Sequence, residues 1–462
     1  MVAQAQKLMN SNTVLRWAML ILISLTMFAI YLVTDEFSPI KTFLEAHNGW
    51  SSSEYGWFSS AYSLFNVFLL MLIIGGLALD KFGIRITGIA SCVICVVGIA
   101  VKYWAMSSTS LSGNIVFFGN EMSQQVFWAS MGYAFFGIGS EVAGVTVTKC
   151  IAKWFTGYEL ALAMGVQVAL ARMGQGAAMI LAPIIATKFG TANAVVLTGL
   201  ILLIIGLSFY VIYSFYDSRF DKQLSAAHIA VAGADEEEFR WSDVIDIFRN
   251  PGFWLIAILC VLFYSAVFPF QKYATELMIN KFGVEESVAG TIPSVLPFGC
   301  IILTPLFGSI YDRKGYGADL MIIGALIITL VHVLFSLPFI NQTWMAYSLM
   351  ILLGIGFALL PSAMWPSIAK MIPSKQLGTA MSLTFYIQNI GLWGVPLLVG
   401  SVLDRFCITG QVTFEGLTRN TYDYTIPSLI FAAFGGLSIL VAFAVKLLDK
   451  KKGYDLQKPN IQ

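Results

Sequence analysis

Long apolar runs, each close to the length needed to cross a bilayer, recur along this sequence from end to end. A transmembrane helix needs about 20 consecutive, mostly apolar residues. Such runs occur near residues 14–34, 55–79, 86–106, 125–150, 159–188, 191–215, 251–278, 286–311, 318–338, 343–371, 376–403 and 424–447. Because the runs are continuously apolar rather than alternating, membrane β-strands are excluded. The sequence therefore predicts an all-α membrane protein with about twelve transmembrane helices in the lipid bilayer.

Composition excludes the alternative of one large soluble core. Of the 462 residues, 58% are hydrophobic and 11% are charged, whereas soluble proteins carry about 25% charged residues. A single soluble core also stops growing near ~250–300 residues. The net charge of +1 gives no indication of nucleic-acid binding. The sequence shows no P-loop, nucleophile–base pair or metal-ligand cluster, so we expect no enzyme, no cofactor and no metal site.

Lysine and arginine residues indicate how the chain lies in the membrane. Cytoplasmic loops carry an excess of these residues, and with both termini inside, most of them fall on the cytoplasmic side. The first apolar run, Val14 to Thr34, is longer than the core of a signal peptide and lacks a small-residue cleavage pattern. We therefore expect it to be the first span, with both termini in the cytoplasm.

The two halves of the chain repeat each other. Gly137-Ile138-Gly139 recurs as Gly354-Ile355-Gly356, an offset of 354 − 137 = 217 residues. The same offset relates further pairs, namely Ile151 to Ile368, Ala163 to Ala380, and Gly174 to Gly391. Internal repeats of this kind are typical of transporters built from two related bundles. The sequence therefore predicts two pseudo-symmetric bundles of six helices each.

Five parts follow from this repeat. They are an N-terminal tail at 1–13, a first bundle at 14–215, a cytoplasmic linker at 216–250, a second bundle at 251–447 and a C-terminal tail at 448–462. The linker contains Glu236-Glu237-Glu238 and then an amphipathic segment from Phe239 to Phe248. We interpret the linker as a solvated connection, and the alternative is a partner-binding segment.

Two short loops share one pattern at equivalent places in the halves. Gly76-Leu77-Ala78-Leu79-Asp80-Lys81-Phe82-Gly83-Ile84-Arg85 follows the second span, and Gly308-Ser309-Ile310-Tyr311-Asp312-Arg313-Lys314-Gly315 follows the eighth. Glycine lets helices approach closely, and the aspartate can pair with a basic residue or a helix N-terminus. The predicted gating residues are Gly76, Asp80, Lys81, Gly83, Arg85, Gly308, Asp312 and Arg313. The second loop lacks a counterpart of Arg85, so its ionic latch should be weaker. The pattern resembles the signature of the major facilitator superfamily.

Three charged residues lie well inside predicted spans. A charge at the centre of a membrane helix costs about 2.5–3.5 kcal/mol on insertion scales and usually marks a pathway. Glu141 lies in the fourth span and Arg172 in the fifth. They form either a structural salt bridge or a bipolar clamp, in which Glu141 binds a substrate ammonium and Arg172 a carboxylate; both can hold in turn. Lys272, in span seven, is four residues before Glu276, a spacing that permits a surface pair.

Other polar and aromatic residues are candidate substrate contacts, although each is also a plausible packing residue. Tyr62 and Asn66 are one turn apart in the second span, and Gln175 is close to Arg172 in the fifth. The rest lie in spans ten and eleven: Trp365, Tyr386, Asn389 and Trp393.

A narrower resemblance rests on residues of spans two to five and of span seven. It includes Tyr62-Ser63 with Asn66, Phe82-Gly83-Ile84-Arg85, Gly137-Ile138-Gly139 with Glu141, Trp154-Phe155, Gln167, Ala171-Arg172, Phe253-Trp254-Leu255-Ile256 and Ala266-Val267-Phe268-Pro269-Phe270. These residues resemble the lysosomal dipeptide transporter branch of the superfamily, whose members are uniporters. The resemblance implies a dipeptide substrate, with Glu141 and Arg172 as the clamp for its terminal charges.

The tail from Met1 to Thr13 shows no acidic dileucine sorting motif. We therefore expect a bacterial cytoplasmic membrane, with a lysosomal or plasma membrane as the alternatives. The expected function is alternating access by a monomer, driven by the gradient of the substrate or by protons. Two rival hypotheses are an organic-anion or sugar-type carrier and a non-transporting receptor or scaffold.

Overall fold

Helices account for nearly all of the computed structural model, which describes residues 9–155, 157–226, 241–373, 376–414 and 416–460. The first half contains η1 (Met9–Ser11), α1 (Thr13–Asp35), η2 (Ser38–Ile40), α2 (Lys41–Asn48), α3 (Ser52–Phe68), α4 (Met71–Ser107), β1 (Asn114–Phe117), β2 (Asn120–Ser123), α5 (Gln124–Phe155), α6 (Leu160–Phe189) and α7 (Ala192–Ala226).

The second half begins after α8 (Trp241–Arg249). It contains α9 (Pro251–Phe282), α10 (Glu286–Ala289), α11 (Thr291–Lys314), α12 (Gly317–Ser336), α13 (Thr343–Met371), α14 (Leu377–Phe406), β3 (Ile408–Phe414), β4 (Leu417–Tyr422) and α15 (Thr425–Lys452). Of the predicted amphipathic segment, α8 covers the described part, while Glu236-Glu237-Glu238 lies outside the described residues.

Eleven of the described helices are long and apolar enough to cross a membrane. One of them, α4, is not a single crossing, because its backbone leaves the helical conformation at Gly83, where φ is 76°. The part before Gly83 continues α3 after a break at Leu70, which adopts a left-handed φ of 55° that is uncommon outside glycine. The second crossing is therefore α3 plus the start of α4, the third is the rest of α4, and the prediction of twelve crossings is confirmed.

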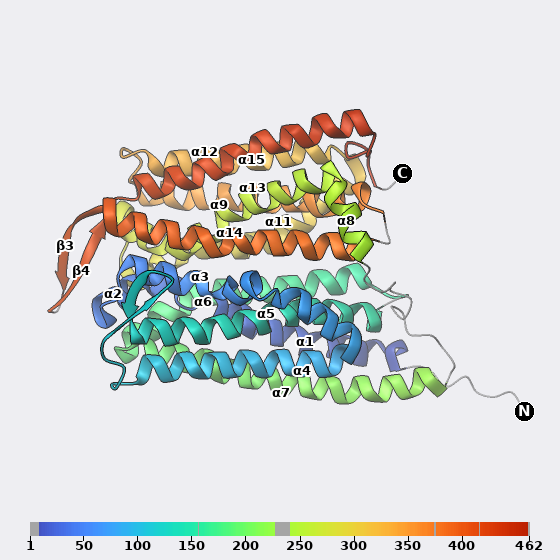
Figure 1. Ribbon diagram of the computed structural model, residues 1–462, viewed down its shortest axis with the longest axis horizontal. Coiled ribbons are helices and arrows are strands. Elements are labelled where there is room, and N and C mark those ends of the chain that lie inside the picture. The colour runs from blue at the N-terminus through green and yellow to red at the C-terminus, as the bar shows by residue number, and fades with distance from the viewer. Residues whose placement is uncertain (1–8, 156, 227–240, 374–375, 415, 461–462) are drawn as a thin grey trace, which may run out of the picture.

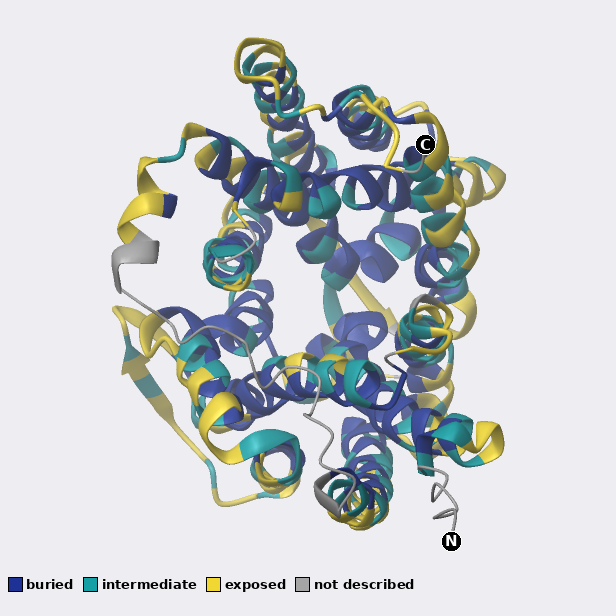
Figure 2. Ribbon diagram, turned by 90° about the vertical axis from the view of Figure 1, so that its right-hand side faces the viewer, coloured by how far each residue is buried: buried dark blue, intermediate teal, exposed yellow. Residues whose placement is uncertain are grey.

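The helices form two bundles that lie side by side (Figure 1). In the first, α4 packs on α5 and α1 on α6, and in the second, α12 packs on α13 and α15. The bundles meet where α3 packs on α14 and α6 on α11. The first and last described residues lie at one end, called the cytoplasmic end here after the lysine and arginine pattern, and the β3–β4 hairpin projects from the opposite, outer end (Figure 1). Viewed from the cytoplasmic end, buried residues line the helix faces within each bundle (Figure 2).

Two glycines of the repeat, Gly174 and Gly391, lie at equivalent helix crossings in the two halves. A Cβ on Gly174 would lie 2.2 Å from the Phe28 carbonyl oxygen, where the fifth span crosses the first. A Cβ on Gly391 would lie 2.3 Å from Ser265 Oγ, where the eleventh span crosses the seventh. Only a residue without a side chain permits such close approach of two helices. The sequence repeat thus reflects a repeated packing geometry.

Candidate functional site

Glu141 is held on α5 by the neighbouring second span. The Tyr62 hydroxyl donates a hydrogen bond to Glu141 Oε1 at 3.0 Å and also lies 3.0 Å from Ser140 Oγ. Glu141 is half-buried. A carboxylate accepts up to about four hydrogen bonds, so Glu141 has acceptor capacity for a substrate besides the bond from Tyr62.

Arg172 is held on α6 by a glutamine and by aromatic rings of both bundles. Its Nη1 donates to Gln175 Oε1 at 2.8 Å. The guanidinium carbon lies 6.0 Å from the ring centroid of Tyr31, 5.8 Å from that of Phe268 and 5.3 Å from that of Phe357. Phe268 and Phe357 belong to α9 and α13, so the second bundle contributes to the surroundings of this cation. Aromatic faces stabilise a guanidinium without using its hydrogen-bond donors.

Glu141 and Arg172 do not form an ion pair with each other in the part of the chain that the structure describes. Each has other partners, Tyr62 for the carboxylate and Gln175 for the guanidinium. Tyr31 lies within electrostatic reach of both. The two opposite charges are thus present on adjacent spans without neutralising each other.

One residue of this region was missed by the sequence analysis. Gln271 on α9 accepts a hydrogen bond from Gln175 Nε2 at 3.1 Å, and both amides are 1% exposed. The contact joins the fifth span to the seventh, and therefore one bundle to the other. In the sequence, Gln271 is an uncharged residue of an apolar run and stands next to the charged Lys272. It therefore gives little indication of a functional role.

The structure places the other predicted contact residues at varying distances from the clamp. Trp365 Nε1 lies 3.3 Å from the hydroxyl of Tyr264, whose ring stacks on Phe268 beside Arg172. Asn66 and Asn389 are buried and bond to helix carbonyls. Trp393 packs edge-on against Phe68 at 5.0 Å, at the junction of the bundles, and Tyr386 is half-buried. Tyr62 and Gln175 bond directly to Glu141 and Arg172, and Trp365 is linked to Arg172 only through Tyr264 and Phe268.

Lys272 and Glu276 do not pair with each other as their spacing suggested. Lys272 Nζ lies 2.7 Å from Asp35 Oδ1, and Glu276 Oε2 lies 2.7 Å from Lys41 Nζ. Both partners belong to the first bundle, on α1 and α2, because the outer half of α9 packs on η2. The Lys41 and Glu276 side chains are 2% and 1% exposed. The Lys41–Glu276 pair is buried and the Lys272–Asp35 pair is partly buried, and both join the two bundles rather than forming a surface pair.

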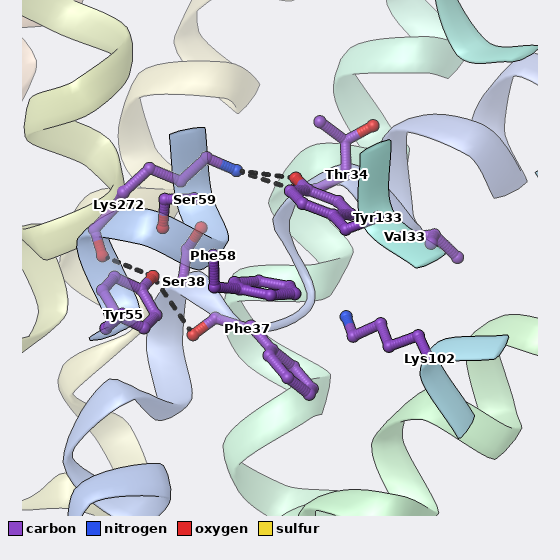
Figure 3. A pocket seen from close by; sticks show the side chains of 10 residues that line it. All are labelled: Val33, Thr34, Phe37, Ser38, Tyr55, Phe58, Ser59, Lys102, Tyr133 and Lys272. Carbon is purple, nitrogen blue, oxygen red and sulfur yellow. Dashed lines mark hydrogen bonds between the residues drawn. The ribbon is translucent and has the colours of Figure 1, made fainter. Parts of the chain in front are cut away.

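The ion pairs between the bundles belong to a larger group of charged residues at the outer end. We call the set of Asp35, Glu36, Lys41, Glu45, Lys102, Lys272 and Glu276 the outer clasp. Lys102 Nζ lies 2.8 Å from Glu36 Oε1, within the first bundle. A pocket too narrow for a water molecule lies mostly within the first bundle, with Lys272 as its lining residue from the second. It is lined by Val33, Thr34, Phe37, Ser38, Tyr55, Phe58, Ser59, Lys102, Tyr133 and Lys272 (Figure 3).

The β3–β4 hairpin and the residue that precedes α15 make further contacts at the outer end. The Tyr422 hydroxyl donates to Glu45 Oε1 at 3.0 Å, and the Tyr424 hydroxyl donates to Glu276. Burial raises the pKa of Tyr422 and of Tyr424, so both phenols stay protonated as donors. Asp404 on α14 accepts from the backbone nitrogen of Ser52 at 3.1 Å, at the start of α3. The outer end is therefore closed by second-bundle groups bound to first-bundle groups.

The two loop motifs are stabilised differently. In the first, Asp80 pairs with Lys149 of α5 at 2.7 Å, and Arg85 pairs with Asp221 of α7 at 3.0 Å. In the second, Asp312 accepts a hydrogen bond from the Asn460 amide at 2.7 Å. The C-terminal tail thus covers the loop that lacks a counterpart of Arg85. The remaining predicted gating residues show that most of each expected loop is helical. Gly76 and Lys81 lie in α4 before its break at Gly83, and Gly308 and Arg313 lie in the last two turns of α11.

Known proteins with similar sequences and a similar fold are membrane transporters. The lysosomal dipeptide transporter of Homo sapiens is 28% identical over 453 residues, covering 96% of this chain and 88% of the relative. Its counterpart in Danio rerio is 31% identical over 354 residues, 74% of this chain and 71% of the relative. A crystal structure of a D-xylose-proton symporter superposes with a TM-score of 0.69 at 14% identity, over 93% of this chain and 97% of the symporter, which shows the fold alone.

The family profile described as Major Facilitator Superfamily matches residues 19–396 and 278–460. The two matches overlap and together extend from the first span to the C-terminal tail. Two six-helix bundles, the duplicated loop motif and this match lead to one conclusion. The chain belongs to the Major Facilitator Superfamily and is a multi-pass membrane transporter rather than an enzyme.

Proposed function

We propose that this transporter carries dipeptides or similar small zwitterions by alternating access, as a facilitative or secondary active carrier. The observation that carries the proposal is the presence of Glu141 and Arg172 on adjacent spans without an ion pair between them. A charge left unpaired inside a membrane protein is costly unless a ligand or water compensates it. A zwitterion supplies one partner of each sign.

The chemistry of the Glu141 and Arg172 side chains matches the two charged ends of a dipeptide. An ammonium group has three donors, which suit the Glu141 carboxylate, and a carboxylate suits the planar fork of an arginine. The relatives from Homo sapiens and Danio rerio that bear the name lysosomal dipeptide transporter support the same substrate class.

Uptake into vesicles tests the proposal. Purified protein is reconstituted, and uptake of a labelled dipeptide is measured for the wild type, Glu141→Gln and Arg172→Ala, with and without a pH gradient. We expect uptake by the wild type and a large loss in both variants, because each removes one charge of the clamp. Normal uptake by both variants would remove the clamp from the account.

Competition separates this proposal from an organic-anion or sugar carrier. Unlabelled dipeptide, a dicarboxylate and a hexose are each added in excess to the same assay. The proposal expects strong competition by the dipeptide alone. Equal or stronger competition by the dicarboxylate would indicate that Arg172 binds an anion without a matching role for Glu141.

A further inference from the structure

Hydrogen-bond directions in the clamp region follow from the chemistry of one residue. Arginine carries donors only, so the Gln175 atom that lies 2.8 Å from Arg172 Nη1 is its acceptor oxygen, Oε1. The other end of the Gln175 amide must then be the donor nitrogen. This nitrogen faces Gln271 at 3.1 Å, so the Gln271 atom in contact is in turn its oxygen. The Arg172 guanidinium therefore fixes the orientation of both amides in this row of hydrogen bonds.

The Gln271 nitrogen at the end of this chain is left without a partner. Gln271 Nε2 is one of the buried polar atoms that lack a hydrogen-bond partner within the described residues, and the residue is 1% exposed. Buried donors are nearly always satisfied, and one that is not calls for an explanation, such as a functional role. Flipping the amide would not help, because two NH2 groups would then face each other.

The geometry points to Gln271 as a second donor for the carboxylate of the substrate, supplied by the second bundle. This inference rests on the proposed function. A carboxylate accepts up to about four hydrogen bonds, which leaves room for Gln271 Nε2 besides the Arg172 guanidinium. The two donor residues are neighbours, joined by hydrogen bonds through Gln175.

The consequence is that the carboxylate end of the substrate touches both bundles. Arg172 lies on α6 of the first bundle, and Gln271 lies on α9 of the second. The next residue of α9, Lys272, bonds to Asp35 in the outer clasp. Substrate contact and outer closure therefore fall on consecutive residues of one helix, with Gln271 binding the substrate and Lys272 belonging to the outer clasp.

Binding measurements with blocked substrates test this role. Affinity for a dipeptide and for its C-terminal amide is measured by thermal shift on purified wild type, Gln271→Leu and Gln271→Glu. We expect Gln271→Leu to weaken dipeptide binding about tenfold, as the loss of one hydrogen bond to a charged group implies. The amide should be affected much less, since it lacks the charge. Gln271→Glu should weaken the dipeptide further, because it places a second negative charge beside the carboxylate.

The matched control is Gln388→Leu. Gln388 is also a buried glutamine of the second bundle, 8% exposed, and it bonds to Cys260 rather than to the clamp. It should leave the ratio of dipeptide to amide affinity unchanged. Unchanged binding in Gln271→Leu and Gln271→Glu, or an equal loss for dipeptide and amide, would overturn the inference.

The same assay separates failure of the inference from failure of the proposed function. If the wild type binds a simple carboxylate but no dipeptide, the dipeptide proposal fails. The role of Gln271 is then decided with that carboxylate and its amide under the same criteria. If the wild type binds neither dipeptide nor carboxylate, both proposals fail.

Discussion

At the scale of single residues, we expect an arginine at position 172 to bind the substrate better than a lysine would. The guanidinium contacts Phe268 and Phe357 and still offers donors to a substrate. We predict that Arg172→Lys keeps the positive charge but lowers dipeptide affinity roughly tenfold. Lysine lacks the planar fork and the stacking of a guanidinium, and a charge-assisted bond contributes about 1.5–3 kcal/mol. Binding isotherms on purified protein measure this, and wild-type affinity in Arg172→Lys would contradict it.

Tyr62 should act on the opposite end of the substrate. Its hydroxyl donates to Glu141 at 3.0 Å, so Tyr62→Phe leaves the carboxylate less firmly placed. We predict a loss of roughly 2- to 10-fold in dipeptide affinity, which corresponds to about 0.5–1.5 kcal/mol for one hydrogen bond. An N-acetylated dipeptide, which has no ammonium group, should bind both proteins equally. A change of equal size for the acetylated and free dipeptides would show that Tyr62 does not act through Glu141.

The residues that sequence reasoning found and missed differ in how strongly the membrane penalises them. Glu141 and Arg172 stand out because a charge in a span is costly. Gln271 is uncharged, and its importance depends on an unpaired donor that is visible only in the folded chain. The partners of Lys272 and Glu276 could not be predicted either, because Asp35 and Lys41 lie more than 200 residues earlier in the sequence.

At the scale of secondary-structure elements, the outer clasp should resist opening. Removing one member of a buried ion pair costs about 3–5 kcal/mol, and both side chains of the Lys41–Glu276 pair are buried. We predict that Lys41→Glu opens the outer end, and that combining it with Glu276→Lys restores closure. Labelling of a Ser59→Cys reporter with a membrane-impermeant maleimide measures this, since Ser59 lines the buried pocket. Protein without Ser59→Cys gives the background, because the native cysteines are buried.

The matched control for the clasp is an exposed pair. Lys446 and Asp319 lie 2.5 Å apart with side chains 43% and 35% exposed, and exposed pairs contribute about 0–1 kcal/mol. Lys446→Ala should therefore leave the reporter protected. The clasp interpretation fails if Lys41→Glu also leaves Ser59→Cys protected.

Helix contact on α5 depends on Gly137. A Cβ there would lie 2.0 Å from the Tyr62 carbonyl oxygen, so Gly137→Ala must push α3 away from α5 and displace Tyr62 from Glu141. We predict a destabilisation of about 1–3 kcal/mol, the usual cost of overpacking, together with weaker dipeptide binding. Gly436→Ala on α15, with nothing within 4 Å of its Cβ position, should leave both unchanged. Thermal melts and binding isotherms of the two variants make the comparison, and equal behaviour would contradict it.

At the scale of the whole molecule, the sequence was sufficient for the architecture. Spans near twenty residues predicted the crossings, and the offset of the repeated glycines predicted two related bundles, because both signals come from local composition and packing. The β1–β2 and β3–β4 hairpins were not predicted, since short strands between spans carry little periodic signal. The closure of the outer end was not predictable either. It depends on contacts between residues of the two halves, which lie far apart in the sequence and form no local sequence pattern.

The central claim is that two opposite charges on adjacent spans, Glu141 and Arg172, bind the two ends of a zwitterion. The most direct test measures affinity for a dipeptide, its N-acetyl derivative and its C-terminal amide in wild type, Glu141→Gln and Arg172→Ala. The account predicts that the wild type prefers the free dipeptide, that Glu141→Gln no longer distinguishes it from the N-acetyl form, and that Arg172→Ala no longer distinguishes it from the amide. Two variants that retain both preferences of the wild type would contradict the account.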